Sequence, residues 1–89
     1  MSVAAQFVPF ESRGLTVKRL DDFSIKLYYR GVKVDALKSA LSTLAMHTNS
    51  VGYELVWKEP CYFVYVMRFY CAQNTYDAMG MVSEVRKVL

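Results

Sequence analysis

The sequence predicts an α+β fold, a two-layer sandwich in which a four-stranded, mostly antiparallel sheet carries two helices on one face. In each half of the chain, two segments of alternating apolar and polar residues precede one segment with helical periodicity, which gives the order ββαββα. A chain of 89 residues that is 54% hydrophobic can bury a core as one small domain, here residues 14–89. A ferredoxin-like βαββα core, in which the first strand is only an arm, is the alternative.

The segment 61–71 is predicted to be the strand that organises the sheet. It is rich in aromatic and β-branched residues and carries a single charge, Arg68. Its odd-numbered residues are apolar or amphipathic, so they are expected to face the core: Cys61, Phe63, Tyr65, Met67, Phe69 and Cys71. The even-numbered residues are expected on the opposite face.

The first half begins with residues 1–13, an N-terminal arm that contains Pro9 and shows no sustained period. Residues 15–20 and 23–30 then alternate, and Asp21 and Asp22 between them predict the turn of a hairpin. The core face of its second strand is expected to carry Phe23, Ile25, Leu27 and Tyr29.

A helix is predicted over residues 36–46, with Asp35 as its N-cap. Its apolar residues recur at steps of three and four, so one stripe should pack on the sheet: Val34, Leu37, Ala40, Leu41 and Leu44.

The second half repeats this plan. Residues 53–58 alternate, Glu59 and Pro60 predict a turn, and the long strand follows. Asn74 is the expected cap of the last helix, whose core stripe is Ala78, Val82, Val85 and Leu89. Gly80 lies inside this helix, where we interpret it as permitting close approach to the sheet or to a second copy.

The sheet face that the helices leave uncovered is the predicted working surface. It is expected to present tyrosines and valines among cations, and Arg68 in its middle is expected to pair with an acid such as Glu54. The residues expected to contact a partner are Lys26, Tyr28, Arg30, Val56, Lys58, Tyr62, Val64, Val66, Arg68 and Tyr70, with Thr16 and Lys18 beside them.

Two functions fit such a face. Because valines left in water favour association, the first is a non-catalytic protein-interaction module, a small regulator, inhibitor or adaptor that docks on another macromolecule or forms a homodimer. The alternative is binding of single-stranded RNA, since tyrosines stack on bases and cations neutralise phosphates. An ordinary solvated face is the third interpretation. The net charge of +3 alone is too small to imply a nucleic-acid partner.

We do not expect an enzyme, a cofactor, a metal or a small-molecule substrate. His47 is the only histidine and sits at a predicted helix end, where it more commonly caps carbonyls. Cys61 and Cys71 are expected to be buried, inert thiols, about 33 Å apart along one strand and so unable to form a disulfide. The carboxylates are dispersed, and the glycines form no phosphate-binding loop.

The chain is expected to be cytoplasmic and not bound to a membrane. Its first residues lack a basic segment followed by an apolar one, which is the pattern of a secretory signal. Its apolar runs are also shorter than the roughly 18 residues that a membrane-spanning helix needs.

Overall fold

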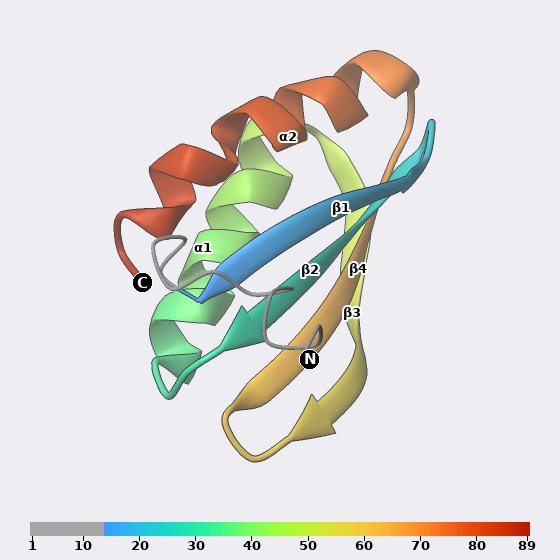
Figure 1. Cartoon of the computed structure of the whole chain (residues 1–89). Helices are drawn as coiled ribbons and strands as arrows, with labels where there is room; N and C mark the ends of the chain where they lie inside the picture. The colour runs from blue at the N-terminus through green and yellow to red at the C-terminus, as the bar shows by residue number, and fades with distance from the viewer. Residues whose placement is uncertain (1–13) are drawn as a thin grey trace, which may run out of the picture.

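The order of elements along the chain is the predicted ββαββα. The computed structural model describes residues 14–89, so the predicted arm of residues 1–13 lies outside the described residues. The elements, shown in Figure 1, are β1 (Leu15–Asp21), β2 (Ser24–Arg30), α1 (Val34–His47), β3 (Ser50–Glu59), β4 (Tyr62–Phe69) and α2 (Ala72–Arg86).

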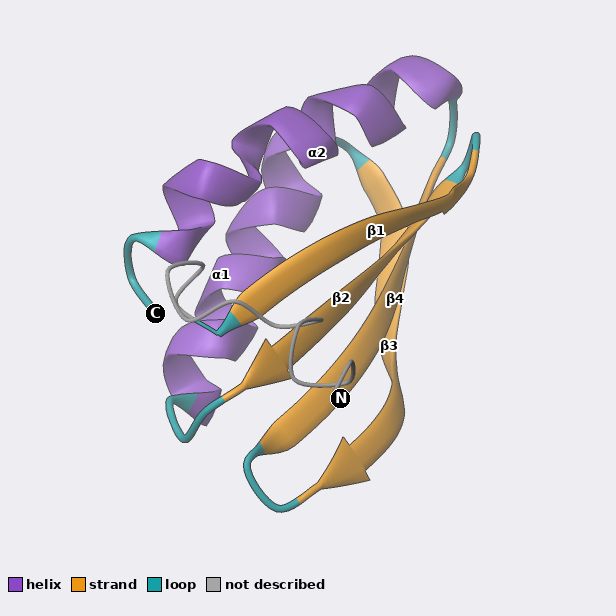
Figure 2. Ribbon diagram, in the orientation of Figure 1, coloured by secondary structure: helices purple, strands orange, loops and turns teal. Residues whose placement is uncertain are grey.

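The sheet has the strand order β1-β2-β4-β3, and all neighbouring strands are antiparallel. The two ββα halves therefore place β2 and β4 side by side in the centre, with β1 and β3 at the edges. Both helices lie on the same face of the sheet, as Figure 2 shows. The predicted two-layer α+β fold is confirmed, and the βαββα alternative is wrong because β1 is a full strand paired along β2.

The core lies between the sheet and the helices and follows the predicted periodicities. Burying one large apolar side chain contributes about 1.5–3 kcal/mol, so the face with most such side chains turns inward. The central strands bury Ile25, Leu27, Tyr29, Phe63, Tyr65, Met67 and Phe69. Opposite them lie Leu37, Ala40, Leu41, Leu44, Ala78, Val82, Val85 and Leu89.

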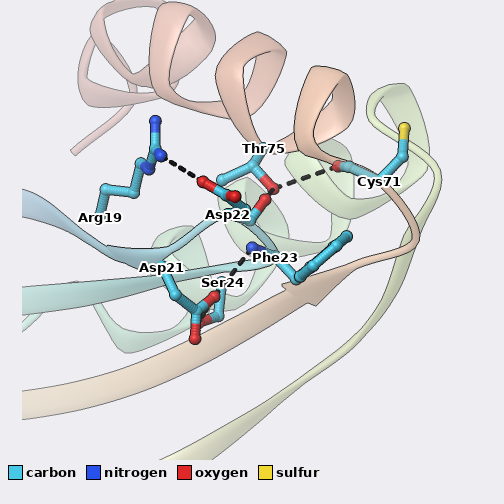
Figure 3. Close-up of polar contacts among 7 residues, drawn as sticks. All are labelled: Arg19, Asp21, Asp22, Phe23, Ser24, Cys71 and Thr75. Carbon is cyan, nitrogen blue, oxygen red and sulfur yellow. Dashed lines mark hydrogen bonds and ion pairs between the residues drawn. The ribbon is translucent and has the colours of Figure 1, made fainter.

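The hairpin between β1 and β2 turns one residue later than predicted. Asp21 still pairs with Ser24, so Asp22 and Phe23 form the turn and Phe23 is exposed instead of facing the core. The Asp21 carboxylate holds this turn (Figure 3), because its Oδ1 accepts hydrogen bonds from the Phe23 N–H at 2.8 Å and from the Ser24 hydroxyl at 2.9 Å. The Phe23 N–H is the main cause that lowers the pKa of Asp21.

Helix α1 begins earlier than predicted and does not use the predicted cap. It begins at Val34, so Asp35 lies in its first turn, and Lys33 occupies the cap position without a side-chain hydrogen bond. The Lys33 N–H does have a nearby oxygen, since it donates to the Tyr29 hydroxyl at 3.1 Å. This packing requires a glycine at position 31, because a Cβ on Gly31 would lie 2.6 Å from that hydroxyl oxygen.

Helix α2 also begins earlier than predicted. Cys71 is at the cap position, so Asn74 lies inside the helix and is not its cap. The buried Thr75 connects the first turn of α2 to the β1–β2 hairpin, since its hydroxyl donates to the Asp22 carbonyl at 2.7 Å. Gly80 is exposed, and a Cβ there would meet nothing within 4 Å, so the predicted close approach of this residue to the sheet is wrong.

Candidate interaction surface

The sheet face opposite the helices, called the open face below, is defined by strand register. Residues directly opposite each other in an antiparallel pair point to the same face, as Tyr28 and Val64 do. The open face consists of Thr16 and Lys18 on β1, Ser24, Lys26, Tyr28 and Arg30 on β2, Tyr62, Val64, Val66 and Arg68 on β4, and Glu54, Trp57 and Glu59 on β3. The residues of β2 and β4 predicted to contact a partner thus lie together on this face, whereas Tyr70 follows the end of β4.

Strand β3 departs from simple alternation in its middle. Its register against β4 shifts between Leu55 and Trp57, which leaves Val56 as an extra residue without a partner on β4. Beyond this bulge, Trp57 lies on the open face opposite Val64, and Lys58 lies on the helix side. The predicted placement of Lys58 on the open face is therefore wrong, and Val56 is the unpaired residue of the bulge. The sequence gives one hint of this. Leu55, Val56 and Trp57 are consecutive apolar residues, so odd- and even-numbered positions are both apolar here and neither face is clearly the inner one.

Cations and aromatic rings pair with each other on the open face. The Lys26 Nζ lies 5.5 Å from the centre of the Tyr28 ring. The Arg30 guanidinium carbon lies 4.8 Å from the centre of the Tyr62 ring. Both distances are in the range of cation–π attraction, so each of these rings already has a positive charge over it.

The remaining charges of the open face form two polar pairs. Arg68 Nη1 lies 2.7 Å from Glu54 Oε1 across β3 and β4, which confirms the pairing expected for this arginine. Trp57 Nε1 donates to Glu59 Oε2 at 3.0 Å. Because both pairs are exposed, they orient side chains and contribute little to the stability of the fold.

Val64 and Val66 are buried, contrary to the expectation that the open face leaves them in water. Their side chains are 4% and 8% exposed. Every other buried hydrophobic residue of the described chain belongs to the core between sheet and helices, and these two do not. The open face therefore does not expose a continuous apolar surface.

Strand β3 carries more exposed large apolar residues than any other element of the described chain. In the described part of the chain this strand pairs with β4 alone, so its other side is an edge of the sheet. Its large apolar residues are between 36% and 55% exposed, and we call them the β3 edge: Val51, Tyr53, Leu55, Val56 and Trp57.

One side chain of the β3 edge is held in place by the helix layer. The Tyr53 hydroxyl lies 2.8 Å from the Ser42 hydroxyl of α1. The Tyr53 ring meets Tyr65 edge to face, with centres 6.1 Å apart. Burial raises the pKa of the Tyr65 phenol, and the nearby Tyr53 adds to this effect.

The residues with catalytic potential lie apart from one another. Cys61 and Cys71 are both exposed at opposite ends of β4, so the expectation of buried thiols is wrong. The strand is shorter than predicted, because Cys61 belongs to the β3–β4 turn with φ 61° and Cys71 precedes α2. Within residues 14–89, no three His, Cys, Asp or Glu side chains are grouped to hold a metal ion.

A groove of about 550 Å³ lies between the helices. Small and apolar side chains line most of it, with His47 of α1 and Glu84 of α2 as its ionisable groups: Ala36, Ser39, Ala40, Thr43, His47, Met81, Glu84, Val85 and Val88. It contains neither cysteine, and its two hydroxyl side chains, Ser39 and Thr43, lie on the same helix as His47.

Comparison of the chain with models of protein families, with curated proteins and with solved structures finds no match. Among the described residues, neither helix is long and apolar enough to cross a membrane.

Proposed function

We propose that the protein is a non-catalytic interaction module that binds protein through the β3 edge, and that one such partner is a second copy of the chain. The observation that carries this proposal is the exposure of five large apolar residues on a single edge strand. An edge strand has unpaired backbone N–H and C=O groups, to which another strand can add.

The distribution of apolar residues favours strand addition over a contact with one face. Leu55 and Trp57 lie on opposite faces of the sheet, and Val56 lies between them at the bulge. A strand added beside β3 would contact side chains on both faces at once. Because apolar surface gains about 25 cal/mol per Å² when it leaves water, such a contact is favoured over leaving these side chains exposed.

The arrangement of ionisable groups supports a non-catalytic role. His47 and the two thiols lie on separate elements, and several carboxylates are engaged in turn contacts and ion pairs, such as Arg68 with Glu54. A general base needs a proton donor within hydrogen-bond reach, and no such pair is formed by these groups in the described chain.

Light scattering coupled to size exclusion tests the self-association. The molar mass of the wild type should rise from one chain toward two chains between about 1 µM and about 1 mM, the range in which a weak interface dissociates. Val56→Glu should keep the mass of one chain, because it places a charge in the contact. Val88→Glu is the matched control, since Val88 is an exposed valine outside β3 and its replacement should leave association unchanged.

A wild type that stays at the mass of one chain over this range would exclude self-association through the β3 edge. If Val56→Glu and Val88→Glu weakened association equally, the contact would lie elsewhere.

Binding of single-stranded RNA is the second candidate, favoured by the aromatic rings and cations that share the open face. Tyr28, Tyr62 and Trp57 provide the rings, and Lys26 and Arg30 are placed over two of them. Stacking of a base would have to displace these cations toward phosphate. An oligonucleotide titrated at low salt should then quench Trp57, and loss of one ring should weaken binding by about 1–3 kcal/mol. Absence of binding at tens of micromolar would remove this candidate.

A further inference from the structure

The bulge in β3 determines what kind of strand fits along its free side, which is one edge of the described sheet (Figure 1). Val56 is an extra residue between Leu55 and Trp57, so the alternation of faces changes phase there. From 52 to 55 the odd-numbered residues lie on the helix side, and from 57 to 59 they lie on the open face. A second copy of β3 carries the same extra residue. If the two bulges lie opposite each other, neither strand has an unmatched residue along the shared side.

Two antiparallel copies meet in this way in one register. Its two-fold axis passes between Leu55 and Val56, so that Leu55 of each copy lies opposite Val56 of the other. Residues directly opposite each other must point to the same face of the sheet. On either side of the bulges this requirement is met, because the opposite residues share a face: Glu54 with Trp57, Tyr53 with Lys58, and Gly52 with Glu59.

Neighbouring registers fail on faces or on charge. An axis through Leu55 would place Tyr53, on the helix side, opposite Trp57 on the open face. An axis through the extra residue of the bulge would place Leu55 opposite Trp57, with the same conflict. An axis just beyond that residue would place Glu54 opposite Glu59, and like charges in this position are destabilising. An axis through Tyr53 would place both bulges of β3 opposite regular residues and leave Trp57 outside the contact.

The charges of the open face complement each other in the same register. Gly52 lies opposite Arg68 on β4, and on its other side it would lie opposite the partner's Glu59. A Cβ on Gly52 would meet nothing within 4 Å, so the space above this residue is open. Arg68 and the partner's Glu59 would be two strand spacings apart, about 10 Å between Cα atoms, so their long side chains can meet over the glycine.

Both members of this contact already have a defined position on the open face. Arg68 Nη1 lies 2.7 Å from Glu54 Oε1 of its own chain. Glu59 Oε2 accepts a hydrogen bond from the Trp57 indole N–H at 3.0 Å. Because a guanidinium has five N–H donors, Arg68 can bind a second carboxylate without releasing the first.

We propose that two copies pair through residues 52–59 of β3, with the two-fold axis between Leu55 and Val56 and with Arg68 of each copy bound to the partner's Glu59. This inference deepens the proposed self-association and rests on it. Four of the five β3-edge residues enter the contact, and Val51 lies beyond its end. The two sheets become one antiparallel sheet of eight strands, with all four helices on the same face.

Charge exchange between two variants tests the register. Arg68→Glu alone and Glu59→Arg alone each place like charges across the contact twice per dimer, so each should raise the dissociation constant about tenfold. Mixed in equal amounts, the two variants form a heterodimer in which both cross-contacts are attractive again. Light scattering, at the concentration where half of the wild type is dimeric, should therefore give a higher mass for the mixture than for either variant alone.

Lys18→Glu is the control, because Lys18 is exposed on the same face but lies on β1, at the far edge of the sheet. Its mass should equal that of the wild type. A wild type that stays at the mass of one chain would overturn both the self-association and the register. A wild type that dimerises, together with a mixture no heavier than the separate variants, would overturn the register alone.

A contact measured in the wild type gives a second readout that needs no substitution. In a sample mixed from isotope-labelled and unlabelled chains, the Tyr53 ring protons should show nuclear Overhauser contacts to the Lys58 side chain of the other copy. Within one chain these residues are five positions apart along the strand, about 16 Å, which is too far for such a contact. A contact between chains supports the register. Its absence in a sample that is dimeric by mass would overturn it.

Discussion

Replacing Thr75 by valine tests the connection between α2 and the β1–β2 hairpin. Thr75 is 1% exposed, and its hydroxyl lies 2.7 Å from the Asp22 carbonyl and 3.3 Å from the Cys71 carbonyl (Figure 3). The single hydroxyl proton goes to the closer acceptor, which is 53 residues away in sequence. Valine keeps the shape of threonine and removes this donor.

The expected cost follows from the burial of the bond. The bond is partly buried, so leaving the Asp22 carbonyl without this donor costs about 1–2 kcal/mol, the lower part of the range for a buried acceptor. Thr75→Ser keeps the hydroxyl and removes one methyl group, which costs about 0.8 kcal/mol. Thr75→Val should therefore lower the free energy of unfolding more than Thr75→Ser, and each kcal/mol corresponds to about 4–8 °C in Tm for a domain of this size.

Urea unfolding followed by Trp57 fluorescence and by far-UV circular dichroism measures both variants. Ser83→Ala is the control, because Ser83 is exposed on the same helix and its replacement should not lower stability. A Thr75→Val protein as stable as Thr75→Ser would refute the argument, since the bond between the hairpin and α2 would then contribute nothing.

Three further changes have effects that the structure predicts. Gly80→Ala should raise the free energy of unfolding by about 1 kcal/mol, measured in urea, because its Cβ meets nothing. Gly14→Ala should lower Tm, because Gly14 has φ +81° and a Cβ there would overlap the Arg30 carbonyl. Asp21→Ala should be less stable than wild type at pH 7. The Phe23 N–H lowers the pKa of Asp21 below 3.8, so this difference should disappear as pH falls through that lowered value; a pH-independent difference would contradict it.

The fold could be predicted because its main signals are local. The two-residue period of β2 and β4 and the three- and four-residue steps of the helices identify the buried face of each element without knowledge of its neighbours. Residues such as Leu27, Met67 and Leu41 are buried as predicted. The order of elements in the two ββα halves then leaves few arrangements that bury those faces. A sheet with both helices on one face is the simplest of them.

The ends of the elements were predicted less accurately, because several polar residues near each end are suited to cap a helix. Asp35 and Asn74 are both good caps by residue type, yet each lies inside its helix. Contacts from elsewhere in the fold decide the start, such as the Tyr29 hydroxyl near α1. The predicted strand also extends too far at both ends, because nothing local ends the alternation before Cys61 and Cys71.

The candidate surface was predicted only in part, because β3 has no single apolar parity. Either face of the strand could turn inward at the apolar residues Leu55, Val56 and Trp57. The bulge between Leu55 and Trp57 places Trp57 on the open face. Val64 and Val66 are buried, although the sequence pattern placed them on the face that the helices leave uncovered. The proposed contact is the exposed edge of β3, and the exposure of an edge depends on strand order and not on local sequence.

The two edges of the sheet differ, and this difference limits what the β3 edge can form. At β1, Arg86 Nε of α2 donates to the Leu15 carbonyl at 2.9 Å, so the helix already uses part of that edge. A head-to-tail array would need β1 of one copy to accept β3 of the next. A contact between two β3 strands is self-complementary and closes after two copies. We therefore expect association to stop at the dimer. Masses that rise beyond two chains would mean that β1, despite Arg86, also accepts a strand.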